Sequence, residues 1–283
     1  MDLSNIINGI EAKAAESIKA NEGDYLVDGL LYCHKCNTPK QCRIEILGMT
    51  RTPMCLCKCE TERRDREEAE HKRRQRMLET EKMRRIGFQE ADMQNWTFAN
   101  DDKKNPKTST IAKNYADNFE TMKERKKGLL FYGSVGTGKS YHAACIVNAL
   151  IDKGYPAMMT NFSRLVNTIS GMFEGKQQYI DGLNKFDLLV IDDLSAERDT
   201  EFMNEIIFTI IDSRYRAGLP IIITTNLTSD ELKNPADVRK QRIYSRLLEM
   251  TIPVEVAGKD RRRHKLVADY ADLSDILGLN VTE

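Results

Sequence analysis

The sequence predicts an α/β fold in which a parallel β-sheet lies between helices. From residue 128 onward, short apolar segments typical of buried strands alternate with segments typical of helices. The first apolar segment, 128–132, runs into a glycine-rich segment, and the third, 188–191, is followed by two aspartates. Strands that alternate with helices build parallel sheets covered on both faces, so one such sheet is expected here.

The apolar pattern also places the individual elements of this sheet. We expect strands at 128–132, 157–160, 188–191 and 219–224. Helices are expected at 111–126, 141–153, 163–173 and 201–217. Gly154 follows the second of these helices and is typical of a helix end, while the last helix repeats isoleucine at helical spacing.

Composition divides the chain into three regions. Residues 1–60 contain an amphipathic helix, with Ile6 and Ile10 on one face, and most of the cysteines. Residues 61–86 are almost entirely charged and lack glycine and proline, which predicts an exposed helical linker. We interpret the linker as a solvated spacer; contact of its basic side chains with nucleic acid is the alternative. Residues 87–283 hold the α/β domain.

The composition and charge of the sequence predict a cytoplasmic protein but do not indicate which partner it binds. The 43 Lys and Arg residues balance the 43 Asp and Glu residues, so the net charge indicates no particular partner. No apolar run is long enough to span a membrane, and the N-terminus lacks the pattern of a secretion signal. The cysteines are clustered, which in a reducing compartment favours a metal site over disulfides.

The segment 133–140 has the spacing of a loop that binds the phosphates of ATP together with Mg²⁺. Its pattern, G-x-x-x-x-G-K-S, lies between a predicted strand and a predicted helix, where backbone N–H groups favour anions. Lys139 is expected to neutralise the β- and γ-phosphates, and the Ser140 hydroxyl to bind Mg²⁺. The predicted nucleotide-binding residues are Gly133, Ser134, Val135, Gly136, Thr137, Gly138, Lys139, Ser140 and Tyr141.

Two further strand ends are expected near the phosphates, because ligands of parallel sheets bind at the carboxyl ends of strands. Asp192 follows the third strand and is predicted to bind Mg²⁺ together with Ser140. Asp193 is expected to orient or deprotonate the attacking water, with Glu197 as a further candidate. Asn226 follows the fourth strand and either bonds the γ-phosphate or the water, or caps the next turn.

The clustered cysteines predict a structural Zn²⁺ site. Two close pairs, C-x-x-C and C-x-C, supply four thiolates, the usual ligands of a closed tetrahedral site. The segment has too few apolar residues to fold alone, so the metal would supply its folding free energy. The predicted ligands are Cys33, Cys36, Cys57 and Cys59, with Cys55 and Cys57 as an alternative second pair and with Cys42 and His34 as bystanders.

Four segments resemble the DnaC/IstB-like group of AAA+ ATPases: GLLFYGSVGTGKSYHAACIVNALI, FDLLVIDDLSAE, IIFTIIDSRYRAGLPIIITTNLT and RIYSRLLEM. The resemblance covers residues 87–275 and is strongest to bacterial and phage helicase loaders of the DnaC/DnaI kind. It implies that the α/β domain is an AAA+ P-loop domain, preceded by the zinc module and the linker. It also implies an ATPase that converts ATP to ADP and phosphate.

The same resemblance implies roles for particular residues. Asn226 matches the first sensor. Arg246 matches the arginine finger, which stabilises phosphate charge in a neighbouring subunit, and Arg242 is the fallback. Arg262, or else Arg263, matches the second sensor and would contact the nucleotide; binding of DNA phosphates is the alternative for these arginines.

An arginine finger implies self-association into a ring or an open helix, because one subunit completes the site of the next. The resemblance further implies a helicase loader that binds single-stranded DNA and delivers a DnaB-type replicative helicase, which residues 1–60 bind. The zinc module favours this function over its alternative, an IstB-type transposition-helper ATPase. A third hypothesis is a nucleotide-switched scaffold that does not hydrolyse ATP.

Overall fold

The computed structural model describes residues 20–46, 48–194, 200–261, 270, 273–274 and 276–277. The N-terminal amphipathic helix and the candidates Glu197, Arg262 and Arg263 lie outside these residues. The chain divides into two compact units, Met1–Leu78 and Glu79–Glu283. Among the described residues, no helix is both long enough and apolar enough to cross a membrane.

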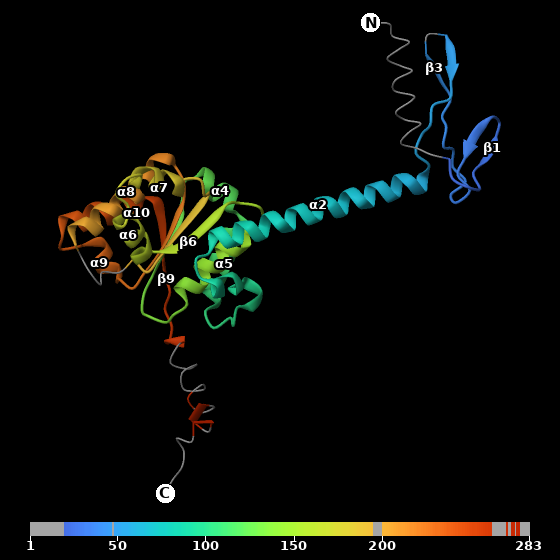
Figure 1. The fold of residues 1–283 in the computed structure, drawn as a ribbon. Helices are drawn as coiled ribbons and strands as arrows, with labels where there is room; N and C mark the ends of the chain where they lie inside the picture. Colours follow the sequence, from blue (N-terminus) through green and yellow to red (C-terminus); the bar gives the residue numbers. More distant parts are fainter. Residues whose placement is uncertain are drawn as a thin grey trace. The chain divides into compact units, whose positions relative to one another are not determined.

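The N-terminal unit contains two short antiparallel hairpins, drawn in blue in Figure 1. They pair β1 (Tyr25–Val27) with β2 (Leu30–Tyr32) and β3 (Ile44–Ile46) with β4 (Met49–Arg51). The turn between β1 and β2 is formed by an Asp-Gly pair whose φ angles are 49° and 76°. Positive φ at both positions is what a two-residue hairpin turn of this kind requires.

A buried polar contact contributes to the small core of this unit. Lys40 donates to Asp24 over 2.6 Å (Nζ to Oδ2), and both side chains are buried. The Lys40 ammonium holds the pKa of Asp24 well below its usual range. His34 lies on the exposed side of the same carboxylate, with 3.1 Å between Nδ1 and Oδ1. Burying two charges is costly, and here the cost is offset because the Lys40 ammonium and the Asp24 carboxylate neutralise and hydrogen-bond each other.

Helix α2 (Lys58–Gly87) contains the charged region of the sequence. Its exposed charges form i,i+4 ion pairs, including Arg63 with Glu67 at 2.6 Å and Arg85 with Glu81 at 2.7 Å. The helix ends where the chain approaches the sheet of the larger unit. A Cβ at Gly87 would lie 2.5 Å from the carbonyl oxygen of Ala157, so this approach requires glycine.

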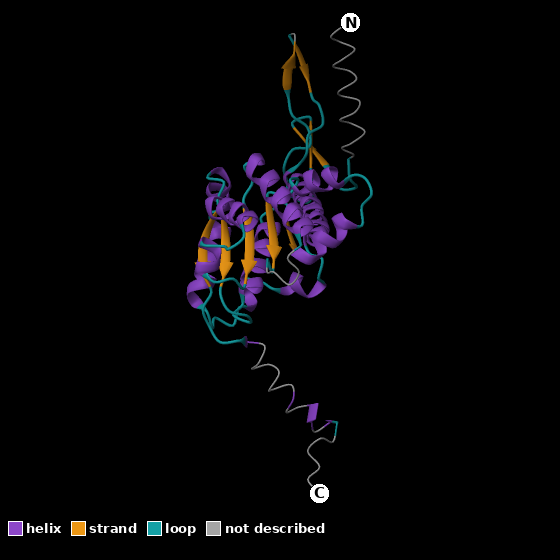
Figure 2. Cartoon of the chain, turned by 90° about the vertical axis from the view of Figure 1, so that its left-hand side faces the viewer, coloured by secondary structure: helices purple, strands orange, loops and turns teal. Residues whose placement is uncertain are grey.

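Five parallel strands form the sheet of the larger unit, which confirms the predicted architecture (Figure 2). In spatial order they are β6 (Ala157–Asn161), β7 (Leu188–Asp192), β8 (Ile221–Thr225), β5 (Gly128–Tyr132) and β9 (Thr251–Glu255). All four expected strands are present, and β9 is an addition. The chain runs from β5 to the edge strand β6, returns to β8, and then crosses to β9. The strand order therefore reverses beside β5, where sheets of this type bind ligands.

Helices cover both faces of the sheet (Figure 2). One apolar core lies under α6 (Phe162–Ser170), α7 (Lys176–Leu183), α8 (Glu201–Ala217), α9 (Ser229–Lys233) and α10 (Val238–Met250). The other lies under η1 (Ala91–Asn95), η2 (Phe98–Asn100), α3 (Pro106–Asp117), α4 (Phe119–Glu124) and α5 (Lys139–Asp152). The single helix expected at 111–126 is thus two helices, because the helical run is interrupted at Asn118.

A fully buried arginine joins the starts of two strands. Arg214 donates to the carbonyl oxygens of Phe186 (2.7 Å) and Pro220 (2.6 Å), just before β7 and β8. It also bonds the carbonyls of Leu183 and Asp187. Burial lowers its pKa to about 10. The four carbonyls replace water at the two terminal nitrogens, whereas Nε has no hydrogen-bond partner among the described residues, so the cost of burial is only partly offset.

Candidate nucleotide-binding site

The glycine-rich loop leaves the carboxyl end of β5 and leads into the N-terminus of α5. Gly133, Gly136 and Gly138 have φ angles of 130°, 74° and 97°, which L side chains rarely adopt. Gly138 is the residue that precedes α5, so the loop presents backbone N–H groups at a helix N-terminus. This arrangement favours phosphate, as the sequence predicts.

Lys139 is buried within this loop rather than extended into solvent. Its ammonium group donates to the carbonyl oxygens of Gly133 (2.8 Å) and Ser134 (2.7 Å). The Thr137 hydroxyl donates to the same Ser134 carbonyl over 2.9 Å. These bonds hold the positive charge against the concave loop, where it is available to a phosphate group.

Asp192 lies at the end of β7, within reach of the loop. The Thr224 hydroxyl, on the neighbouring strand β8, donates to Asp192 Oδ1 over 2.5 Å. Burial raises the pKa of Asp192, and hydrogen bonds from Thr224 and Ser140 oppose that rise. A partly desolvated carboxylate beside a serine hydroxyl is a donor set that suits Mg²⁺. The structure therefore brings together the two residues predicted to bind this metal.

Asp193 and Asn226 meet beside Asp192. Asp193 has a φ of 55°, a left-handed conformation that is uncommon for a residue other than glycine. Its backbone N–H donates to the Thr224 hydroxyl over 2.9 Å, and its Oδ1 accepts from Asn226 Nδ2 over 3.2 Å. One hydroxyl thus contacts both Asp192 and Asp193. Thr224 is one residue of this site that the sequence did not identify, since a threonine in a buried strand is ordinary.

If the site hydrolyses ATP as the sequence predicts, we expect Thr224→Val to lower kcat by about ten- to a hundredfold while the KM for ATP changes little. The substitution removes a hydrogen bond to a carboxylate, worth about 1.5–3 kcal/mol, and 1.36 kcal/mol corresponds to a factor of ten. Steady-state ATPase kinetics test this, and Thr224→Ser, which keeps the hydroxyl, is the matched control. Equal losses in both variants would contradict a role for the hydroxyl.

The chain returns to the glycine-rich loop after β9. The backbone N–H of Arg261 donates to the carbonyl oxygen of Gly136 over 3.0 Å. Its guanidinium donates to Asp102 over 3.1 Å and lies against Gly138. Asp260 packs so closely on Gly136 that a Cβ there would lie 1.8 Å from its Oδ1. Of the three consecutive arginines, the structure thus places the first at the loop.

Tyr141 ties α5 to the segment that precedes α3. Its hydroxyl donates to the carbonyl oxygen of Thr97 over 2.9 Å, and its ring lies 5.9 Å from that of Trp96. Burial raises its pKa. These contacts give Tyr141 a packing role, and its contact with the nucleotide stays a prediction.

Arg246 lies at the other end of the sheet from the glycine-rich loop. It is on α10, which ends at Met250 and leads directly into β9. The first residue of β9 pairs with Gly128, the first of β5, whereas the loop follows the last residue of β5. The Arg246 guanidinium pairs with Asp212 and lies 5.2 Å from the Phe208 ring centroid. The structure therefore does not bring Arg246 to the nucleotide site of its own chain.

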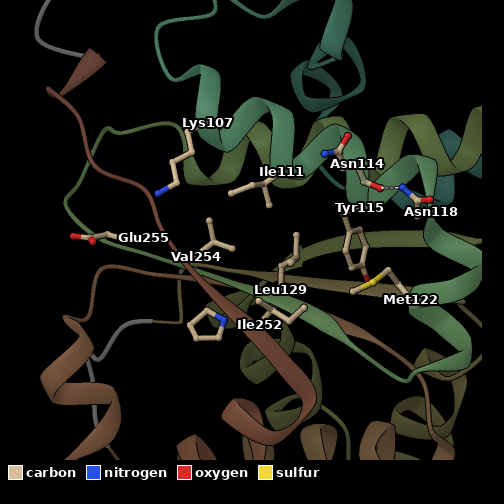
Figure 3. A pocket seen from close by; sticks show the side chains of 11 residues that line it. Lys107, Ile111, Asn114, Tyr115, Asn118, Met122, Leu129, Ile252, Val254 and Glu255 are labelled. Carbon is tan, nitrogen blue, oxygen red and sulfur yellow. Dashed lines mark hydrogen bonds between the residues drawn. The ribbon is translucent and has the colours of Figure 1, made fainter.

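A groove of about 500 Å³ runs between helix α3 and the edge strand β9 (Figure 3). Ile111, Leu129, Ile252 and Val254 are among its apolar lining residues. None of the residues predicted to bind nucleotide or metal lines it. The groove is therefore separate from the candidate nucleotide site.

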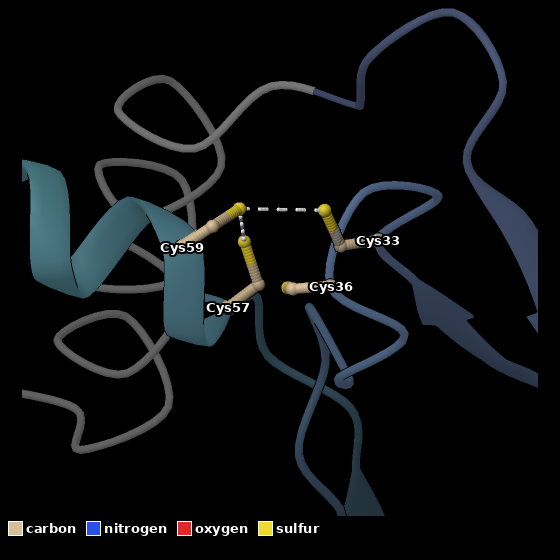
Figure 4. Close-up of side chains that lie close together, drawn as sticks. All are labelled: Cys33, Cys36, Cys57 and Cys59. Carbon is tan, nitrogen blue, oxygen red and sulfur yellow. Dashed lines mark hydrogen bonds between the residues drawn. The ribbon is translucent and has the colours of Figure 1, made fainter.

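The four predicted zinc ligands form one cluster in the N-terminal unit (Figure 4). The sulfurs of Cys33, Cys36, Cys57 and Cys59 all lie within 4.8 Å of one another. Cys59 Sγ is 3.7 Å from that of Cys33 and 3.4 Å from that of Cys57. Sulfurs bound at about 2.3 Å to tetrahedral Zn²⁺ lie about 3.8 Å apart, so the cluster fits this metal. Cys55, the alternative ligand, lies outside the cluster.

The comparisons with known proteins cover most of the larger unit. The family model described as IstB-like ATP binding protein matches residues 59–268. The replicative helicase loader DnaI of Bacillus subtilis (strain 168) is 26% identical over 185 residues, 60% of this chain and 60% of DnaI. The replicative helicase loader DnaC of Escherichia coli (strain K12) is 26% identical over 125 residues. That match covers 43% of this chain and 50% of DnaC, so the similarity spans only part of each relative.

Solved structures are similar to part of this chain. The crystal structure of the DnaC helicase loader has a TM-score of 0.51 at 25% identity and covers 59% of this chain and 100% of that one. The crystal structure of DnaI has a TM-score of 0.52 at 24% identity and covers 62% of this chain and 94% of that one. Both support an AAA+-like α/β fold for the larger unit.

Proposed function

The chain belongs to the family of IstB-like ATP binding proteins, and on that premise we propose that it is an ATPase that loads a replicative helicase onto single-stranded DNA. The hydrogen-bonded group of Asp192, Thr224, Asp193 and Asn226 beside the glycine-rich loop carries the ATPase part of the proposal. The names of the DnaI and DnaC relatives support the loading part.

Each site residue has a defined part in the proposed hydrolysis. The loop amides and Lys139 hold the β- and γ-phosphates of ATP. Mg²⁺, when held by Ser140 and Asp192, supplies further positive charge to the phosphates. Asp193 accepts a proton from the attacking water, and Asn226, which donates to Asp193, orients that carboxylate and the water.

Arg246 completes this site from a neighbouring subunit. Its place at the opposite end of the sheet supports action in trans, because a side chain cannot span the length of β5 and β9. We therefore propose a head-to-tail assembly, closed or helical, in which each ATP lies between two subunits.

The N-terminal unit is proposed to bind the helicase and to depend on Zn²⁺ for its fold. Its first hairpin exposes apolar side chains, and Leu26 is 69% exposed. Met49 in the second hairpin is 51% exposed. Contiguous exposed apolar surface is typical of sites that bind another protein, and the consecutive residues Tyr25, Leu26 and Val27 of β1 are all exposed.

A loading assay tests the whole proposal. A DnaB-type replicative helicase, circular single-stranded DNA coated with single-strand binding protein, and ATP are mixed with the full chain. We expect DNA unwinding that depends on the chain and that Lys139→Ala abolishes. Absence of loading, together with ATP-dependent recruitment of a transposase to DNA, would instead favour the transposition-helper function. Nucleotide-dependent binding without ATP turnover would favour the scaffold.

A further inference from the structure

A basic segment of helix α2 breaks the charge pattern of the rest of the helix. Residues 71–76, which read HKRRQR, contain Lys72, Arg73, Arg74 and Arg76 and no acidic residue. All of these side chains are exposed. We call this segment the basic block.

Three cations elsewhere in α2, namely Arg63, Arg64 and Arg85, have carboxylate partners on the same helix. Arg63 pairs with Glu60 and Glu67 at 2.5 and 2.6 Å, and Arg85 pairs with Glu81 at 2.7 Å. Within the block, Lys72 pairs with Glu68 at 2.5 Å. In the described part of the chain, no ion pair joins the three arginines of the block to a carboxylate.

The basic block is unfavourable for the helix that contains it. Lys72 and Arg76 are four residues apart, and Arg73 and Arg76 are three apart, so both pairs of like charges are neighbours on the helix surface. Each such pair costs about 0.2–0.5 kcal/mol of helix stability. The Lys72–Glu68 pair offsets part of this cost, and the three arginines, which have no ion pair in the described part of the chain, are available to a partner outside the fold.

The arrangement of these charges fits a flexible polyanion. At about 100° per residue, the side chains from Lys72 to Arg74 spread over roughly 200° of the helix circumference. A rigid acidic protein surface would meet only one side of this arc, whereas a phosphodiester chain can bend around it. Arginine is also the side chain best suited to bidentate bonds with phosphate.

We propose that the basic block binds the phosphate backbone of single-stranded nucleic acid, a surface additional to any DNA contacts of the ATPase unit. The inference rests on the proposed loading function, which requires that the chain meet such a strand. Contacts to phosphates carry no base information, so this binding is independent of sequence and sensitive to salt.

The test compares two full-length triple variants that lose the same charge from the same helix. Arg73→Gln/Arg74→Gln/Arg76→Gln removes the block. Arg63→Gln/Arg64→Gln/Arg66→Gln is the matched control, because Arg63 and Arg64 pair with Glu60 and Arg66 donates to the Glu62 carbonyl oxygen. Glutamine is a good helix former, so both variants should keep α2. Binding of a fluorescent oligothymidylate is measured by anisotropy over a range of NaCl concentrations.

We expect the block variant to bind at least tenfold more weakly at low salt, with the slope of log K against log [NaCl] reduced by about 2 in magnitude. That value follows from about 0.7 counterions released for each phosphate that an arginine neutralises, multiplied by the three arginines replaced. The control should keep the wild-type slope. If both variants lose DNA affinity equally, the effect comes from net charge and not from the block. If neither variant loses DNA affinity, the block is only a solvated surface of the helix. Either result overturns the inference.

The same proteins separate this inference from the loading function. If the wild type loads helicase and the two variants bind DNA alike, the inference fails and the proposed function stands. If only the block variant loses DNA affinity but the wild type loads no helicase, the inference stands and the proposed function fails. If the block variant keeps DNA affinity but loses the helicase, the block is a protein-docking surface and the inference is overturned.

Discussion

Arg246→Ala is expected to lower ATP hydrolysis by the assembled protein about 10³-fold while ATP binding is retained. A guanidinium that reaches the γ-phosphate from the next subunit stabilises charge that spreads in the transition state, so its loss affects turnover more than binding. In its own chain, Arg246 pairs with Asp212 and lies beside the rings of Phe208 and Tyr215. Equilibrium binding of a fluorescent ATP analogue and the rate of phosphate release provide the two measurements.

Mixing two inactive variants tests whether the arginine acts in trans. Arg246→Ala has an intact glycine-rich loop, and Lys139→Ala has an intact arginine. In a random mixture, roughly a quarter of the interfaces combine both intact parts, so a comparable share of the activity should return. Asp212→Asn is the control for the ion pair and should remain active. A loss of ATP affinity in Arg246→Ala, or no recovery on mixing, would place the residue within its own site.

Substitution of any one of the four clustered cysteines by serine is expected to unfold the N-terminal unit. The hairpins have strands of three residues each and expose much of their apolar surface. Metal binding would have to supply the missing free energy, and structural Zn²⁺ sites supply about 10–16 kcal/mol at pH 7. Metal analysis of the wild type should give about one Zn²⁺ per chain, and limited proteolysis should show resistant hairpins.

The matched controls are Cys42→Ser and Cys55→Ser, since both thiols lie in the same unit but outside the cluster. Both should keep the metal and the protease resistance. ATP binding by the larger unit should survive in every cysteine variant, because the two units form separate compact bodies. Wild-type protein free of Zn²⁺ under reducing conditions, or loss of metal in Cys55→Ser alone, would contradict this ligand set.

The sequence predicted the central strands because they are buried on both faces. Strands β5, β6, β7 and β8 are continuous apolar segments, which is what burial in a parallel sheet requires. Strand β9 was not predicted, since it is an edge strand that contains Pro253 and exposes Ile252. The sequence pattern of such a segment predicts a loop, and only its pairing with β5 in the structure identifies it as a strand. The hairpins of the N-terminal unit were missed for a similar reason, because their strands are very short.

The residues of the candidate nucleotide-binding site also divide into those that the sequence pattern reveals and those that depend on strand pairing. Lys139, Ser140, Asp192 and Asp193 could be predicted because phosphate and Mg²⁺ chemistry imposes their identity and spacing. Thr224 was not found, since its contribution depends on which strand lies beside β7. Sequence pattern does not reveal such a register.

The bond between Arg261 and Gly136 has a thermodynamic consequence for the site as a whole. It makes the conformation of the glycine-rich loop and that of the chain after β9 parts of a single equilibrium. If ATP favours one state of the loop, then a partner that binds the chain after β9 and favours one of its states alters the affinity for ATP, and ATP alters the affinity for that partner by the same factor. Such a partner would therefore change the affinity for the nucleotide phosphates through two hydrogen-bonded residues, without touching the nucleotide.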